Sequence, residues 1–145
     1  MATVLSKNFT LDELVYSETA RKHHMPNVPD NQVVVNLTWL VMKVLQPLRT
    51  WWGKPISIGS GYRCVALNAM VGGVPDSQHV TGEAADLCID GDKEKGRKWF
   101  EWIKKNCEFD QLIWEKNAKT GNYWVHVSYR KTGNRKMVVD GLIKK

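Results

Sequence analysis

The sequence is poor in cysteine, and its few cysteines form no framework. Cys64, Cys88 and Cys107 are the only three in 145 residues, and no two of them stand in a C-x-x-C spacing. An odd number without that spacing predicts neither a complete set of disulfides nor a cysteine zinc cluster. The three thiols are therefore expected to be reduced.

Long apolar runs are lacking as well. No stretch approaches the ~18 apolar residues that a membrane span needs. The segment from Met1 to Asn8 also lacks the apolar core of a secretory signal. We therefore expect no membrane span, and a protein that is cytoplasmic as synthesised.

Basic residues are in excess, but they form no long block. The chain has 21 Lys and Arg against 15 Asp and Glu, which leaves a net charge of +6. Such a charge favours an anionic partner, for example nucleic acid, an anionic membrane face or an acidic cell-wall polymer. It is equally typical of an ordinary solvated surface. Because no helix-turn-helix, RNA-binding or zinc-finger pattern is present, nucleic acid is not the expected partner.

The length of 145 residues fits one domain, 1–145, since domains usually have roughly 100–200 residues. A chain of this size buries about 68–70% of the surface that its unfolded form exposes. It can therefore sustain a hydrophobic core without disulfide bonds. We expect a monomer.

Two helix starts are visible in the N-terminal part. Thr10, followed by Glu13, forms a capping box that predicts a short helix. Asp30 is a suitable cap for a second helix, because apolar residues recur at helical spacing over residues 34–48. Pro47 lies near the end of this pattern and is expected to bend or weaken the last turn.

The rest of the chain is dominated by strand-like segments. Residues 56–63 are predicted to be a strand that runs into a glycine-bearing turn, followed by a short helix at about 64–70. Further strands are predicted at residues 84–89, 109–114 and 123–129, and a helix at residues 93–105. The polar segment 117–122 would join the last two strands as a hairpin. Helices first and strands later predict an α+β fold, with N-terminal helices packed on a small, mainly antiparallel sheet.

Two of the four histidines stand in unusual surroundings. His126 lies in the centre of an aromatic strand, and His79 precedes a turn at Gly82 that leads into the strand carrying Asp86. If these strands are neighbours, two imidazoles and one carboxylate converge, which is the three-ligand set of a catalytic zinc with one open position. The alternative is that both histidines are structural residues and that Asp86 caps a turn.

These residues form part of a longer pattern. The pattern reads Ser77-x-His79-x-x-Gly82-x-Ala84-x-Asp86, followed by Trp124-x-His126. It resembles the signature of the M15 family of zinc D-Ala-D-Ala carboxypeptidases and murein endopeptidases, which cut peptidoglycan stem peptides and include phage endolysins. The segments 9–14, 17–20, 44–49, 60–63 and 67–68 are similar to the small single-domain branch of that family.

The resemblance implies a fold like that of the hedgehog and DD-peptidase proteins, a zinc ion and a set of site residues. His79, Asp86 and His126 would be the zinc ligands. Arg63 would face the active site and bind or polarise the substrate, since an arginine pairs well with a carboxylate or a developing oxyanion. Ser77 would orient a ligand or contact the substrate, although a turn-forming serine is an equally good interpretation.

The chain departs from the family pattern at the general base. Many members place Glu or Asp three residues before the second histidine, where this chain has Tyr123. A tyrosine, with a pKa near 10, does not replace a carboxylate at neutral pH. Glu115, in the preceding strand, is the best substitute. It shares a face with His126 only if paired residue numbers in the hairpin sum to an odd value, which the sequence leaves open.

The expected function is therefore the hydrolysis of peptide bonds in peptidoglycan peptides. The bond would be one cut by a D,D-carboxypeptidase or endopeptidase, or the L-Ala-D-Glu bond. Trp124, beside His126, would form a wall of the substrate site, and the protein would act on the cell wall after phage-mediated release. The alternative is a non-catalytic, zinc-stabilised wall-binding or virion module in which Tyr123 marks a lost base.

Overall fold

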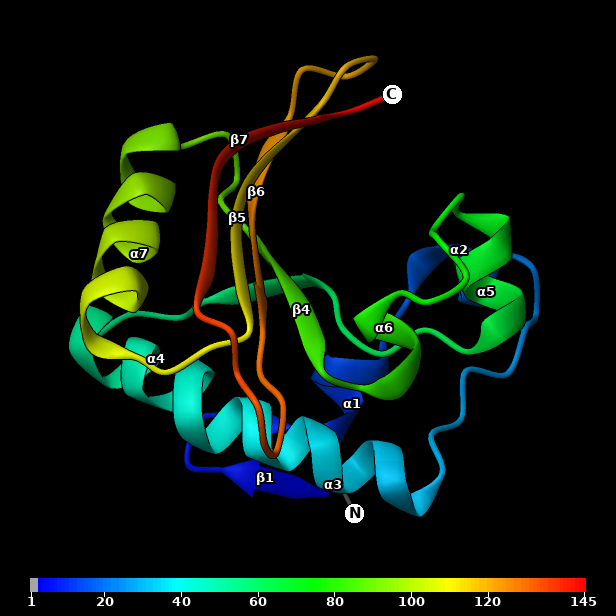
Figure 1. The fold of residues 1–145 in the computed structure, drawn as a ribbon. Coiled ribbons are helices and arrows are strands. Elements are labelled where there is room, and N and C mark those ends of the chain that lie inside the picture. The colour runs from blue at the N-terminus through cyan, green and yellow to red at the C-terminus, as the bar shows by residue number, and fades with distance from the viewer. Residues whose placement is uncertain (1–2) are drawn as a thin grey trace.

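A group of helices underlies a five-stranded sheet in the computed structural model, which describes residues 3–145 (Figure 1). The N-terminal elements are β1 (Val4–Ser6), β2 (Phe9–Thr10), α1 (Leu11–Val15), α2 (Glu18–Lys22), α3 (Asn31–Leu40), a π-helical turn η1 (Val41–Leu45) and α4 (Gln46–Trp52). The remaining elements are β3 (Ser57–Ser60), α5 (Val65–Met70), α6 (Gln78–Thr81), β4 (Ala84–Cys88), α7 (Lys93–Asn106), β5 (Gln111–Asn117), β6 (Tyr123–Ser128) and β7 (Met137–Lys144).

The sheet has the strand order β3-β4-β6-β5-β7. Strands β3, β4, β6 and β5 pair antiparallel, whereas β7 runs parallel to β5 at the edge. The predicted α+β fold with a mainly antiparallel sheet is therefore confirmed, and so is the hairpin of β5 and β6. The parallel strand β7 and the small β1–β2 pair were not predicted.

The strand periodicity divides the sheet into two faces. Residues on one face are almost fully buried and pack against α7 and the α3–α4 helices. This face carries Ala85, Leu87, Leu112, Trp114, Val125 and Val127. Residues of opposite parity, among them Asp86, Glu115 and His126, lie on the other face. The core thus supports the sheet from one side and leaves polar groups together on the other.

The long N-terminal helix continues further than the sequence indicates. It runs through η1 into α4, and it ends at Gly53, which has a left-handed φ of 75°. Pro47 stands in the first turn of α4, directly after the widened turn. A proline removes one N–H and crowds the carbonyl four residues before it, and a π-helical turn accommodates both effects. The helix thus continues past Pro47 to Trp52, so Pro47 does not lie in the last turn as expected.

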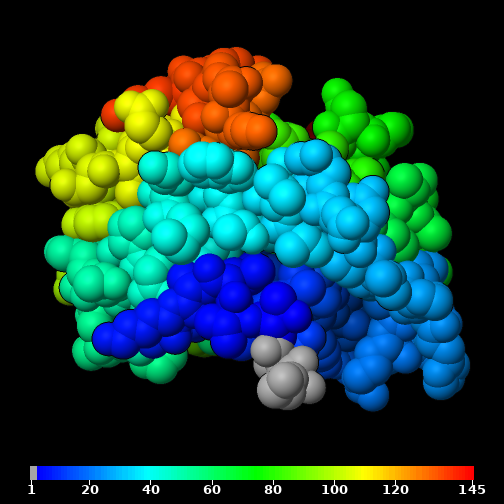
Figure 2. Space-filling view, turned by 90° about the horizontal axis from the view of Figure 1, so that it is seen from below, coloured from blue at the N-terminus to red at the C-terminus, as the bar shows by residue number. Residues whose placement is uncertain are grey.

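The helices cover one side of the molecule as a continuous layer. Figure 2 shows α3 and its continuation running across this side, with the N-terminal strand β1 lying against them. None of the helices within residues 3–145 has the length and apolar character needed to cross a bilayer. The three cysteines are free thiols, as the sequence predicted.

A buried carboxylate ties the C-terminal connection to α6. Asp110 is fully buried and accepts hydrogen bonds from Nη2 of Arg135 at 2.8 Å, from Nε of Arg135 at 3.0 Å and from the side-chain amide of Gln78 at 2.9 Å. The hydrogen bonds from Arg135 lower the pKa of Asp110 to about 2. This network was not recognised in the sequence, because its members are far apart along the chain.

We expect Asp110 to make the fold sensitive to acid. Its folded pKa of about 2 lies below the ordinary value of 3.8, so its contribution is complete above pH 4 and is lost as the pH falls towards 2. Asp110→Asn should lower the free energy of unfolding at pH 7 by about 2 kcal/mol and should flatten its decline between pH 4 and 2. Urea unfolding at several pH values measures both effects. Glu108→Gln, at an exposed neighbouring position, is the control, and an unchanged acid profile in Asp110→Asn would contradict the assignment.

Candidate metal centre

Three side chains with ligating atoms meet on the open face of the sheet. His126 Nδ1 lies 2.9 Å from Asp86 Oδ1, and His79 Nε2 lies 3.4 Å from Asp86 Oδ2. One ligating atom from each residue lies within 4.8 Å of those of the other two. The structure therefore brings together all three residues that the sequence analysis selected.

Strand pairing explains two of the three positions. Asp86 on β4 is the direct cross-strand partner of His126 on β6, so their side chains project from the same face. Burial alone would raise the pKa of Asp86, but His79 and His126 beside it hold that pKa well below its usual range. The carboxylate is therefore ionised at neutral pH, as a metal ligand must be.

His79 is held by the backbone around it. It lies in the four-residue helix α6, directly before the turn at Gly82. Its Nδ1 lies 2.7 Å from the carbonyl oxygen of Gly61, which only accepts hydrogen bonds, so Nδ1 carries the proton and Nε2 is free to ligate. Gly61 itself has no room for a side chain, because an added Cβ would lie 2.1 Å from the carbonyl oxygen of Leu14.

Ser77 supports the same histidine from the start of α6. Its Oγ accepts a hydrogen bond from the backbone N–H of His79 at 3.1 Å, and the residue also lines the cavity in front of the metal centre. The turn after α6 is made by Gly82, with a φ of 78°. The structure thus gives Ser77 a helix-capping contact with the backbone of a candidate ligand.

We expect Ser77→Ala to weaken zinc binding without unfolding the protein. Loss of a support behind a ligand typically lowers metal affinity 10- to 100-fold, and we expect a loss of about 10-fold here. Competition with a chromogenic zinc chelator measures this change, with the thermal unfolding curve as a check on folding. Ser57→Ala, at an exposed position on β3, is the matched control. Equal zinc affinity in both variants would show that the capping contact has no such effect.

Glu115 lies on the same face as the candidate ligands. It pairs with Trp124 across the hairpin, so paired residue numbers sum to an odd value, which is the condition that the sequence left open. Its Oε1 is 4.0 Å from His126 Nδ1, and the residue is only 3% exposed. Burial raises the pKa of Glu115, the nearby Asp86 adds to this rise, and Lys144, with Nζ 4.0 Å from Oε2, opposes it.

Tyr123, at the usual position of the base, points to the other face. Its ring stacks on Trp114, with 5.1 Å between the ring centroids, and Trp114 belongs to the core side of the sheet. The position three residues before His126 therefore does not face the candidate ligands in this chain.

Arg63 reaches the centre from the segment after β3. Its guanidinium is partly buried, and burial lowers its pKa, whereas the carboxylates of Asp86 and Glu115 raise it. Within residues 3–145 it forms no ion pair, and its buried Nε has no hydrogen-bond partner. A cavity of about 350 Å³ brings Arg63 together with Glu115 and both histidines. Lys144 and Arg135 also line this cavity, and neither had been selected from the sequence.

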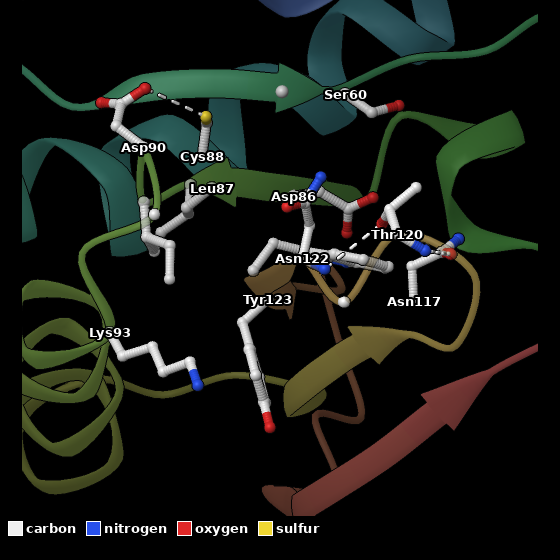
Figure 3. A pocket seen from close by; sticks show the side chains of 15 residues that line it. Ser60, Asp86, Leu87, Cys88, Asp90, Lys93, Asn117, Thr120, Asn122 and Tyr123 are labelled. Carbon is white, nitrogen blue, oxygen red and sulfur yellow. Dashed lines mark hydrogen bonds between the residues drawn. The ribbon is translucent and has the colours of Figure 1, made fainter.

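Trp124 faces a different hollow. It lines a second cavity of about 740 Å³, which adjoins the metal centre at Asp86 (Figure 3). The predicted residues thus occupy one continuous region of the molecule: Arg63, Ser77 and Glu115 line one cavity with the histidines, and Trp124 lines the next.

The fold and this site define a class of protein. Two imidazoles, a carboxylate and a buried second carboxylate beside a cavity are the side chains found in zinc metallopeptidases. The donor atoms fit zinc in type and number, and they lie close enough together for all three to bind a single ion.

Comparison with known proteins agrees with this class. The peptidase M15 family model matches residues 7–128, and the chain belongs to that family. A stretch of 49 residues is 45% identical to the zinc D-Ala-D-Ala carboxypeptidase of Streptomyces albus G. The stretch covers 33% of this chain and only 19% of that relative. The family match confirms the resemblance to M15 that the sequence pattern indicated.

Proposed function

We propose that the protein hydrolyses peptide bonds in peptidoglycan stem peptides or cross-links, with zinc held by His79, Asp86 and His126. The observation that carries the proposal is the convergence of these ligating atoms within 4.8 Å, beside a buried carboxylate and an unpaired arginine. When bound, zinc supplies a Lewis acid that acidifies water and polarises the scissile carbonyl group.

Glu115 would act as the general base. It would take a proton from the attacking water and pass it to the amine that leaves. Burial beside the reaction site raises the pKa of this carboxylate towards neutral pH. A group with such a pKa is suited both to accepting the proton and to passing it on.

Arg63 would hold the substrate. An arginine that has no acidic partner within the described chain has its hydrogen-bond donors free for a peptide carboxylate or for the oxygen that becomes negative during the reaction. Ser77 would fix the orientation of His79, and Trp124 would form one wall of the substrate site.

Purified murein and defined muropeptides, incubated with the zinc-loaded protein, test the proposal. We expect new amino termini, and mass spectrometry of the fragments identifies the bond as a terminal D-Ala bond, a D,D cross-link or the L-Ala-D-Glu bond. Binding to murein without any fragments, by a protein with full zinc content, would overturn the proposal. That result would favour the non-catalytic wall-binding or virion module.

A further inference from the structure

The cavity of about 740 Å³ that Trp124 lines lies next to the metal centre. It lies between the end of β4 with the loop that follows, and the tip of the β5–β6 hairpin (Figure 3). Its wall includes Asp86 at one point, and Tyr123 and Lys93 at another. Because Asp86 belongs to the metal centre too, a peptide that crosses the metal would continue into this cavity.

Lys93 brings positive charge to the cavity beside Tyr123. Lys93 Nζ lies 4.6 Å from the centroid of the Tyr123 ring, and Lys116 Nζ lies 5.5 Å from the same centroid. Within the part of the chain that the structure describes, neither lysine forms an ion pair with a carboxylate. Two ammonium groups thus lie near one aromatic ring, and of the two it is Lys93 that lines the cavity.

The acids of the cavity do not neutralise this charge. Asp90 lies 3.3 Å from Nζ of Lys95 and accepts a hydrogen bond from the thiol of Cys88. Asp86 is engaged by the two histidines of the metal centre. Lys93 therefore presents uncompensated positive charge to whatever enters the cavity.

Hydrogen bonds within the hairpin tip shape the hairpin side of the cavity. In the hairpin tip, Asn117 Oδ1 accepts hydrogen bonds from the backbone N–H groups of Lys119 at 2.9 Å and Thr120 at 3.0 Å. Thr120 Oγ1 accepts one from the backbone N–H of Asn122. These contacts hold the tip in place, so the cavity is shaped before any ligand arrives.

We propose that this cavity binds the substrate on one side of the scissile bond, and that Lys93, which lines it, pairs with a carboxylate of that segment. The inference rests on the proposed function and extends it, because it assigns an acidic peptide segment to a particular part of the site. The occupant is the peptide itself, since the cavity is continuous with the metal centre at Asp86.

Binding of synthetic peptides to the full, zinc-loaded chain tests this assignment. The probes are a peptidoglycan pentapeptide with free carboxyl groups, the same peptide amidated at the α-carboxyl of its D-Glu, and the same peptide amidated at its C-terminus. Calorimetry in a Glu115→Gln background gives Kd without turnover. We expect Lys93→Gln to weaken binding of the free peptide about fivefold, in the upper range for a partly exposed charge pair.

Amidation identifies the carboxylate. Amidation of the group that meets Lys93 should weaken binding by the same factor, and Lys93→Gln should then have no further effect on that peptide. Lys105→Gln, at an exposed position on the same helix, is the control and should bind all three peptides like its parent.

Two results would overturn the assignment. One is an equal effect of Lys93→Gln on all three peptides, and the other is no effect on any. The assay is separate from catalysis: a wild-type chain that binds with the expected pattern but cuts nothing would refute the proposed function and leave the cavity assignment standing.

Discussion

Replacing Glu115 by glutamine should reduce kcat for a defined muropeptide by about 10²- to 10⁴-fold, the usual contribution of a general base. Glutamine keeps the size of the side chain but does not accept a proton at neutral pH. Zinc content should stay at the wild-type level, because Glu115 is not among the three candidate ligands. Steady-state kinetics with metal analysis of the same sample measures both quantities.

Tyr123→Phe provides the matched comparison. It alters the position that carries the base in many relatives but removes only a hydroxyl group. Because this ring stacks on Trp114, on the face away from the ligands, we expect kcat within a few-fold of wild type. A large loss of kcat in Tyr123→Phe, together with a small loss in Glu115→Gln, would show that Glu115 is not the general base.

Replacing His126 by alanine should abolish both zinc binding and cleavage, with activity at least about 10³-fold lower. The variant leaves two of the three ligands, so the affinity for the metal collapses. Removing zinc from the wild-type protein with a strong chelator should have the same effect, and added zinc should restore activity. Metal analysis, muropeptide kinetics and the unfolding curve should be measured together.

His23→Ala is the control for this substitution. His23 is exposed at the end of α2, outside the metal centre, and its loss should leave zinc content and activity unchanged. Full activity of His126→Ala, or of a chelated sample shown to contain no zinc, would contradict the proposed metal chemistry.

The sequence predicted those parts of the site that depend on local periodicity. Alternation along two strands was enough to place Asp86 and His126 on one face, and the structure shows them as direct cross-strand neighbours. The position of Glu115 depended on the register of the hairpin. Register is fixed by the packing of the whole sheet and by the turn, so it became known only from the structure.

Other parts of the site arise from contacts between distant segments. Lys144 reaches Glu115 because β7 pairs in parallel with β5 after a long connection, and no turn signal marks such a pairing. Arg135 and Gln78 meet at Asp110 for a similar reason. These residues are ordinary surface types in the sequence, and only the tertiary fold gives them a role.

The contact between Gly61 and Leu14 has a consequence for protein engineering. The carbonyl that orients His79 belongs to Gly61, and the N–H of the next residue, Tyr62, donates to the carbonyl of Leu14 at 2.7 Å. The first helix therefore influences the position of a candidate metal-binding imidazole, although none of the three candidate ligands belongs to it. We therefore expect chimeras that exchange this helix between relatives to keep an intact metal centre only if the recipient has glycine at the position of Gly61, where the backbone passes the carbonyl of Leu14.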